Sequence, residues 1–406
     1  MNSSLTWIDH DAKARERTVK ILNFYQEKES RDELGLGSIR DSFADQLFPG
    51  TSTIQTRLRY MLFVPWIYKD LEDKKTPSDR FAKEADKLER DLIAPLKAAE
   101  ESEGVIGGRA GKSVVRLPSS VYWAGLGVWG IRITPFSQDD YHKRIDETYR
   151  CRKFLEAQKK SSKARGDDGD LGLAGTNWHP QLPPPPDDFY NTVDFALSRE
   201  EAEFILDRIQ VSCPNSLLAF LSLYCNPAED IRAPWEHPDY GLFPEQHKSL
   251  LTQARLFSDV MHGASLSYNI QLARLRDNET LIAKHQASFT EWRENLPLDE
   301  IRAWDINQLW AMTSKPGHTI TQPTRNFVEN WISHVCNSPD NLLSDMKILN
   351  LVRNREISLK KNHSRFTNRR TLEQWGGSSG TGRLVYRWPN VQVLLNDLYQ
   401  GLNREE

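Results

Sequence analysis

The sequence predicts a mainly α, multi-helical protein in two parts, with a minor β element near its C-terminus. Apolar residues recur mostly at the three- and four-residue spacings of amphipathic helices. Runs with the alternating pattern of strands are too few to build a doubly wound sheet. Residues 159–188 are rich in glycine and proline and have too little apolar surface to order themselves, so we expect a flexible linker or loop there. This stretch separates an N-terminal helical domain, residues 1–158, from a C-terminal helical domain, residues 189–406, which ends in a basic, aromatic segment.

In the N-terminal domain, capping and breaking residues mark the helices. A helix is predicted around residues 19–24, and a short one over residues 38–47 stops at a Phe-Pro-Gly run. A longer helix should start at Thr51 or Ser52, and Pro65 should kink it or end its first half. The remaining predicted elements are helices over residues 78–93, 121–131 and 138–160, and a short strand over residues 114–117.

In the C-terminal domain, Ser198 and Glu201 form the capping-box pattern, which predicts a helix start at this point. Residues 376–382 form a glycine-rich turn, and residues 384–388 are the best strand candidate, which is the minor β element. The other predicted helices cover residues 215–224, 245–295, 321–335, 342–353 and 390–402.

Composition and charge limit the function classes. The chain is 38% hydrophobic and 27% charged, with a mean hydropathy of −0.61. Its 53 Lys and Arg against 56 Asp and Glu give a net charge of −3, so any nucleic-acid site must be a local patch. The N-terminus lacks a signal-peptide pattern, and the most apolar run, residues 60–68, is about half the roughly 20 residues that span a bilayer. With four scattered cysteines and no C-x-x-C, we expect a cytoplasmic protein without membrane attachment.

Acidic and basic residues are mixed around the second and third predicted helices. Asp41 and Asp45 share a helix face, and paired carboxylates can hold Mg²⁺ or serve as acid and base in a nuclease or phosphohydrolase. The neighbouring arginines favour a structural ion-pair elbow instead. No histidine or cysteine has metal-ligand spacing, so neither a metal nor a cofactor is expected. The residues of the predicted elbow are Arg31, Asp32, Arg40, Asp41, Asp45, Arg57 and Arg59.

The strongest local charge signal lies over residues 353–370, where seven Lys and Arg stand against the single acid Glu356. Lys and Arg neutralise phosphates, and exposed aromatic rings stack on bases. A helix pair, a basic segment and a glycine-rich turn before a strand also resemble, loosely, a helix-turn-helix with a wing. The alternatives are a solvated basic face or a surface for an acidic protein partner. The predicted nucleic-acid-binding residues are Lys360, Lys361, Arg365, Arg369, Arg370, Arg383, Arg387 and Trp388.

Several runs together resemble an uncharacterised bacterial family known as a domain of unknown function. The longest covers residues 31–66 and reads RDELGLGSIRDSFADQLFPGTSTIQTRLRYMLFVPW; shorter ones lie at residues 104–107, 117–123, 375–377 and 386–388. Because the runs reach both ends of the chain, the resemblance is essentially full-length. It implies a cytoplasmic prokaryotic protein and a loose association with mobile or anti-phage gene neighbourhoods. The family supplies no established catalytic residues.

The combined expectation is a nucleic-acid-binding, non-catalytic subunit of a bacterial defence or DNA-processing system. One alternative is a protein–protein adaptor in such an assembly, since twelve tryptophans are many for this length and some could lie exposed at an interface. The other is a metal-dependent nuclease or phosphohydrolase that uses Asp41 and Asp45. The chain has no catalytic motif that would make it an enzyme on sequence grounds.

Overall fold

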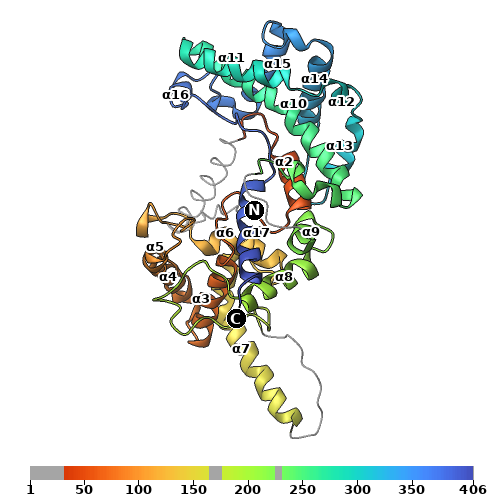
Figure 1. Ribbon diagram of the computed structural model, residues 1–406. Coiled ribbons are helices and arrows are strands. Elements are labelled where there is room, and N and C mark those ends of the chain that lie inside the picture. The colour runs from red at the N-terminus through yellow and green to blue at the C-terminus, as the bar shows by residue number, and fades with distance from the viewer. Residues whose placement is uncertain (1–31, 164–175, 225–230, 406) are drawn as a thin grey trace, which may run out of the picture. The chain divides into compact units, whose positions relative to one another are not determined.

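The computed structural model describes residues 32–163, 176–224 and 231–405. Over these residues the protein is mainly helical, which confirms the predicted class (Figure 1). The predicted helix around residues 19–24 lies outside the described residues, as does Arg31 of the predicted elbow. None of the described helices combines the length and the apolarity needed to cross a bilayer.

The predicted minor β element is wrong. The described residues form no strand and hold only an isolated antiparallel bridge between Arg132 and Trp178. Over residues 384–388 the backbone is irregular and then turns into a helix. Tyr386 and Arg387 adopt φ values of 53° and 69°, in the left-handed region, which interrupts the extended backbone that a strand requires.

The described chain forms two compact units. Unit 1 consists of residues 32–43 and 249–386, and unit 2 of the described residues between 44 and 248 together with residues 387–405. This division differs from the predicted domains. Residues 189–224, 231–248 and 387–405 of the predicted C-terminal domain belong to unit 2, and residues 32–43 of the predicted N-terminal domain belong to unit 1. Residues 176–188 of the predicted linker pack inside unit 2. Trp178 and Leu182 are buried there, and Trp66 donates a hydrogen bond of 2.7 Å from Nε1 to the Pro183 carbonyl.

Unit 2 is organised around α3 (Tyr60–Asp73), which is buried on almost every face. Helix α3 packs on α4 and α6, α4 packs on α7, and the last helix, α17, packs along α8 and α9 (Figure 1). The elements of this unit besides α3 are α4 (Ser78–Asp91), α5 (Ile93–Ala98), α6 (Pro118–Val128), α7 (Gln138–Lys163), α8 (Arg199–Ser212), α9 (Leu217–Tyr224) and α17 (Trp388–Leu402), with 3₁₀ turns η1 (Gly111–Ser113), η2 (Pro234–Glu236) and η3 (Pro238–Leu242).

Helix α3 starts later than predicted. Residues 51–59 form turns, and the helix begins at Tyr60 and continues through Pro65 without interruption. The proline ring removes one helical hydrogen bond, but its neighbours on both sides are fully buried, and their packing holds the helix together. The start of α8 was predicted correctly, since Ser198 and Glu201 form the reciprocal capping box.

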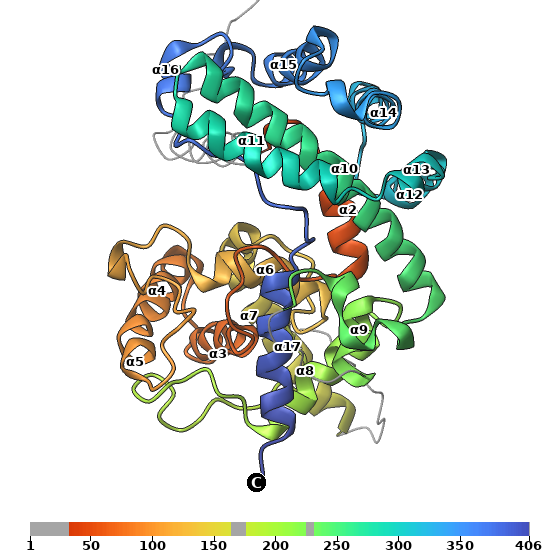
Figure 2. The same ribbon diagram turned by 45° about the horizontal axis from the view of Figure 1, so that its top comes forward.

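Unit 1 is built on α10 (Glu245–Leu275), whose first turn belongs to unit 2, and on α11 (Glu279–Glu294), which runs alongside it (Figure 2). A glycine allows this close approach: a Cβ added at Gly263 of α10 would lie 2.2 Å from the ring of Trp292 on α11. The other elements are α2 (Gly37–Leu47), of which residues 37–43 belong to this unit, α12 (Leu298–Arg302), α13 (Ile306–Thr313), α14 (Gln322–Asn337), α15 (Met346–Lys360) and α16 (Arg369–Glu373), with 3₁₀ turns η4 (Pro339–Asn341) and η5 (Lys361–His363).

Candidate functional site

Two of the predicted nucleic-acid-binding cations are neutralised inside unit 1. The guanidinium of Arg365 lies 2.6 Å from Glu33 Oε1 and donates a 2.9 Å hydrogen bond to the Tyr268 hydroxyl. Lys360 Nζ lies 3.5 Å from the other oxygen of Glu33. All three charged side chains are at most 17% exposed, so they form a buried ion cluster.

Arg383 and Arg387 are also held by carboxylates. Arg383 in unit 1 pairs with Asp259 of α10. Arg387 in unit 2 lies 2.6 Å from an oxygen of Asp45 and has a side chain that is 13% exposed. Neither guanidinium is a free phosphate ligand.

Trp388, predicted to stack on bases, is a core residue of unit 2. It is 1% exposed, its Nε1 donates a 3.0 Å hydrogen bond to the Ile231 carbonyl, and its ring packs 5.8 Å from that of Phe48. Stacking on a base requires an open ring face, and this ring has none.

The other three predicted cations, Lys361, Arg369 and Arg370, are exposed. They lie on the turn after α15 and at the start of α16, and the side chain of Asn368 links these two elements by hydrogen bonds. Its side chain donates a 2.8 Å hydrogen bond to the Asn362 carbonyl and accepts one of 3.3 Å from the Thr371 backbone N–H. Arg369 also contacts Glu373 at 3.0 Å, but both side chains are more than half exposed, so solvent screens this pair.

Two further exposed arginines contact the segment that carries these cations, and we call the five residues Arg276, Arg353, Lys361, Arg369 and Arg370 the α16 surface. Arg353 lies 5.7 Å over the ring of Phe366, and Arg276 lies 5.9 Å over the ring of Trp375, two residues beyond α16. The basic run includes one acid, Glu356, which is fully buried and accepts hydrogen bonds from Ser364 and the Arg365 backbone. Glu356 therefore does not reduce the charge that faces solvent.

A cavity of about 440 Å³ opens next to the α16 surface. Its lining carries one full charge, the Arg276 guanidinium, and no carboxylate. Trp375 is 2% exposed, and its indole Nε1 has no hydrogen-bond partner among the described residues. Arg276 donates a 2.8 Å hydrogen bond to the Trp375 carbonyl. The lining residues are Arg276, Asn278, Thr280, Leu281, Trp375, Gly376 and Gly377.

The glycine-rich turn at this cavity is fixed by buried polar groups of α10 and α11. Asn269 accepts a 2.8 Å hydrogen bond from the Ser379 N–H and donates one of 2.7 Å to the Ser379 carbonyl. His285 is hydrogen-bonded at 2.8 Å to the Gly377 carbonyl. Sequence reasoning treated this turn as a wing beside a strand, whereas the structure makes it one wall of a cavity.

The residues of the predicted elbow in unit 1 stay close to their own helix. Asp32 accepts hydrogen bonds of 2.8 and 2.6 Å from the backbone N–H groups of Leu36 and Gly37, and so caps the start of α2. Arg40 contacts Asp41 at 3.0 Å.

The elbow arginines of unit 2 have distant partners. Arg57 contacts Asp397 of α17 and Glu101, each at 2.9 Å. Arg59 contacts Asp194 at 2.6 Å and the capping residue Glu201 at 2.8 Å. Burial raises the pKa of Asp397, although Arg57 lies beside it. These pairs tie α17 and α8 to the residues that precede α3.

The predicted carboxylate pair does not form a metal site. Asp41 is paired with Arg40, and Asp45 is paired with Arg387. No group of three or more acidic, histidine or cysteine side chains that could hold an ion occurs in the part of the chain that the structure describes. Among the described residues, Asp41 and Asp45 are thus engaged in ion pairs, and neither belongs to a cluster of ligands of the kind that holds a catalytic ion.

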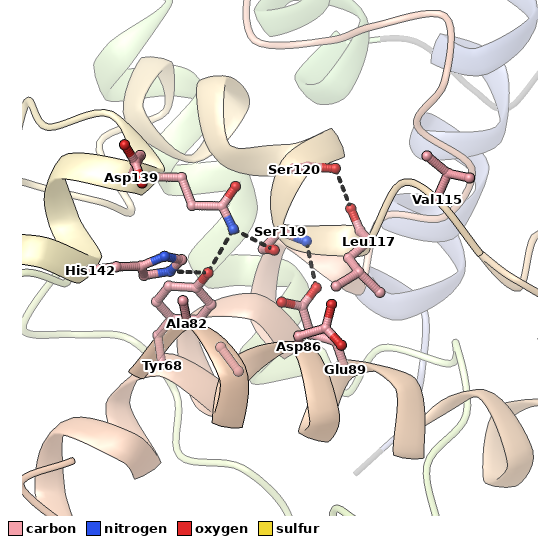
Figure 3. A pocket seen from close by; sticks show the side chains of 12 residues that line it. Tyr68, Ala82, Asp86, Glu89, Val115, Leu117, Ser119, Ser120, Asp139 and His142 are labelled. Atoms are coloured by element: carbon pink, nitrogen blue, oxygen red, sulfur yellow. Dashed lines mark hydrogen bonds between the residues drawn. The ribbon is translucent and has the colours of Figure 1, made fainter. Parts of the chain in front are cut away.

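A second cavity, of about 310 Å³, lies in unit 2 between α4, α6 and α7 (Figure 3). Glu89 of α4 is 2% exposed and accepts a 2.8 Å hydrogen bond from the Ser119 N–H in the first turn of α6. Gln138 of α7 donates to the hydroxyl groups of Ser119 and Tyr68 at 2.7 and 2.8 Å. The Tyr68 hydroxyl is also 2.9 Å from His142 Nε2, which completes a chain of hydrogen-bonded groups (Figure 3).

Burial displaces the protonation equilibria at both ends of this chain. It raises the pKa of Glu89 to about 7 and lowers the pKa of His142 to about 4. Both side chains are therefore mostly uncharged between about pH 4 and pH 7. Sequence reasoning missed this site, but the spacing of Phe81, Ala85 and Glu89 could have indicated it, since it places a carboxylate on the buried face of α4.

Comparison with known proteins gives a family but no activity. A model described as a family of unknown function, DUF6361, matches residues 2–401, and so includes almost all of both units. No curated protein and no solved structure matches the chain. The chain therefore belongs to this family of unknown function, DUF6361, as its full-length resemblance predicted.

Proposed function

We propose that this protein binds nucleic acid without catalysing a reaction on it, through the α16 surface of unit 1. The observation that carries the proposal is the exposure of Lys361, Arg369 and Arg370 on two short elements that Asn368 joins. Exposed cations on one surface neutralise backbone phosphates and release the counterions bound to them. The setting in a bacterial defence or DNA-processing assembly is part of this proposal and comes from the family resemblance.

Five of the eight predicted nucleic-acid-binding residues are not part of this proposal. Lys360, Arg365, Arg383, Arg387 and Trp388 are engaged within the protein, so we assign them to its stability. A polyanion would be held by the three exposed cations of the original set and by Arg353 and Arg276 beside them.

The test is the affinity for a duplex oligonucleotide, measured by fluorescence anisotropy at low salt. The triple variant Lys361→Gln, Arg369→Gln, Arg370→Gln should bind at least 10-fold more weakly than the wild type. A matched control neutralises three exposed lysines of unit 2 that lie outside the surface; it is K83Q combined with K87Q and K97Q. Equal affinities of the two triple variants, or no binding by the wild type at low salt, would refute the proposal.

A second candidate, the adaptor, is favoured by a different observation. None of the eleven tryptophans among the described residues is exposed, so they do not supply an interface. However, Val211, Leu223 and Tyr224, at the C-terminal ends of α8 and α9, are 61%, 49% and 66% exposed. Helices α8 and α9 pack on each other, and exposed apolar side chains on such a pair are typical of protein-binding surfaces. Val211→Asp with Tyr224→Asp should abolish co-purification of a stoichiometric partner from the native host, and unchanged recovery of that partner would exclude this patch.

A further inference from the structure

We propose that the cavity beside α16 is a binding site for a phosphate monoester. One of the residues that line this cavity, Trp375, carries an unsatisfied donor. The indole Nε1–H of Trp375 can only donate, and no described residue accepts from it, although the side chain is 2% exposed. A buried donor without an acceptor is destabilising, and an oxygen of a ligand in the cavity would supply the missing acceptor once the indole edge moves toward it.

The backbone around the cavity adds further unused donors. The N–H groups of Gly376 and Gly377 donate to none of the described residues, whereas the Ser379 N–H of the same turn donates to Asn269. Gly377 has a φ of 90°, which an L-residue adopts only with strain, and its carbonyl is bound to His285. Since Asn269 and His285 hold the turn in place, these donors are preorganised before a ligand arrives.

The N-terminus of α11 faces the same cavity. Asn278 caps this 16-residue helix by accepting from the Leu281 N–H at 3.0 Å, and Thr280 and Leu281 line the cavity. The N–H of Thr280 is left without an acceptor among the residues that the structure describes. A helix N-terminus carries a partial positive charge and favours an anion.

Arg276 supplies the full positive charge. Its guanidinium is exposed, lines the cavity and lies over the ring of Trp375, with one N–H used by the Trp375 carbonyl and four others available. Asp277 and Glu279 are its neighbours in the chain, but neither lines the cavity. The lining therefore combines one cation with unpaired N–H donors of the indole, the glycine turn and the start of α11, and it holds no carboxylate.

This donor set fits a phosphate better than a carboxylate. Donors from an indole, a guanidinium, a glycine turn and a helix end need acceptors that point in several directions, which the three terminal oxygens of a phosphate monoester provide. The cavity, of about 440 Å³, is in the range of pockets that hold small ligands of nucleotide size. The phosphate could belong to a free nucleotide or to the end of a nucleic-acid strand, and the second source rests on the proposed function.

The test uses the whole protein and isothermal titration calorimetry with five probes. These are inorganic phosphate, adenosine 5′-monophosphate, adenosine, and a single-stranded 12-mer with or without a 5′-phosphate. The wild type should bind phosphate and the monophosphate but not adenosine. Arg276→Gln should weaken binding of the monophosphate about 10-fold or more, because it removes the guanidinium. Arg274→Gln changes an exposed arginine in the last turn of α10 that does not line the cavity, and it should leave the affinity for the monophosphate unchanged.

Two tryptophan variants distinguish a role of Trp375 in ligand binding from a purely structural role. Trp375→Phe keeps a ring and removes the N–H, so it should weaken binding about 5-fold, in the range of one hydrogen bond. Trp331→Phe is the control, since Trp331 is also buried in unit 1 but donates from Nε1 to the Val260 carbonyl at 2.9 Å. Without ligand, W331F should lower the melting temperature more than W375F. Phosphate should raise the melting temperature of W331F and not that of R276Q.

The outcomes separate this inference from the proposed function. A 12-mer that binds about 10-fold more tightly with its 5′-phosphate, and loses this preference in R276Q, identifies a strand end as the ligand. Binding of the monophosphate without any binding of the 12-mer supports the inference and refutes the proposed function. Binding of the 12-mer regardless of its 5′-phosphate, with no response to phosphate or the monophosphate, overturns the inference while the proposed function stands. Unchanged monophosphate affinity in R276Q and W375F also overturns it.

Discussion

The chain of hydrogen-bonded groups in Figure 3 predicts opposing effects of pH on stability. The pKa of Glu89 rises from its ordinary value of 4.5 to about 7. Between these two pH values the folded protein therefore keeps a proton that the unfolded chain releases. The contribution of Glu89 to stability is complete below pH 4.5 and is lost as pH rises through 7. The pKa of His142 falls from 6.5 to about 4, so its contribution is present above pH 6.5 and is lost as pH falls through 4.

The two contributions are of similar size and opposite sign. At about 1.4 kcal/mol per pH unit, the displacement of each pKa corresponds to roughly 3 kcal/mol. Solvent reaches part of the His142 ring, which reduces its share. Between pH 4.5 and 6.5 the two effects on the free energy of unfolding therefore largely cancel in the wild type. A variant that lacks one of the two groups should show the pH dependence that the other group causes.

Urea unfolding from pH 4 to 8 tests this cancellation. Glu89→Gln preserves an oxygen to accept from Ser119, and its free energy of unfolding relative to the wild type should rise by about 3 kcal/mol from pH 4.5 to 7. His142→Gln should instead gain on the wild type as pH falls from 6.5 to 4. The control Ser120→Ala changes a residue of the same cavity that has no titratable group in this pH range, and it should give a difference that does not depend on pH. A flat difference for Glu89→Gln as well would refute the assignment of a raised pKa to a buried carboxyl.

Three further changes have definite expected results. Glu33→Gln leaves Arg365 in a buried site without its anion, so urea unfolding should show a loss of about 3 kcal/mol; a loss below about 1 kcal/mol would contradict a buried ion cluster. Trp388→Ala should cost about 3 to 5 kcal/mol in the same assay and leave oligonucleotide affinity unchanged where the protein is folded, because the ring is a core residue. Gly263→Ala forces a methyl group into the ring of Trp292 and should cost about 1 to 3 kcal/mol, whereas a neutral effect on the melting temperature would show that α10 and α11 can separate.

Local features were predictable because nearby residues determine them. The capping box of Ser198 and Glu201 fixes the start of α8, and both partners lie within one turn. The helical class follows from apolar spacing, which is likewise a short-range signal. The minor β element failed because the left-handed backbone at Tyr386 and Arg387 is not visible in a run of strand-forming residues.

The candidate site was predictable only in part, since charge pairing depends on tertiary structure. Arg365 and its partner Glu33 are far apart in the sequence, so the basic run looked uniformly solvated. The same holds for Arg57 and Asp397, at opposite ends of the chain. Lys361, Arg369 and Arg370 could be predicted as charged, but their exposure could not be distinguished from the burial of Lys360 by sequence alone.

The salt dependence of duplex binding tests most directly whether the α16 surface holds a polyanion. Five phosphate contacts, by the residues of the α16 surface, predict a slope of about −4.5 in a plot of log affinity against log salt concentration, and Lys361, Arg369 and Arg370 account for about −3 of it. The variant with all three changed to glutamine should show a slope that is smaller by about this amount, while its far-ultraviolet circular dichroism stays that of the wild type. A wild-type slope near zero, or a variant slope equal to that of the wild type, would contradict the account.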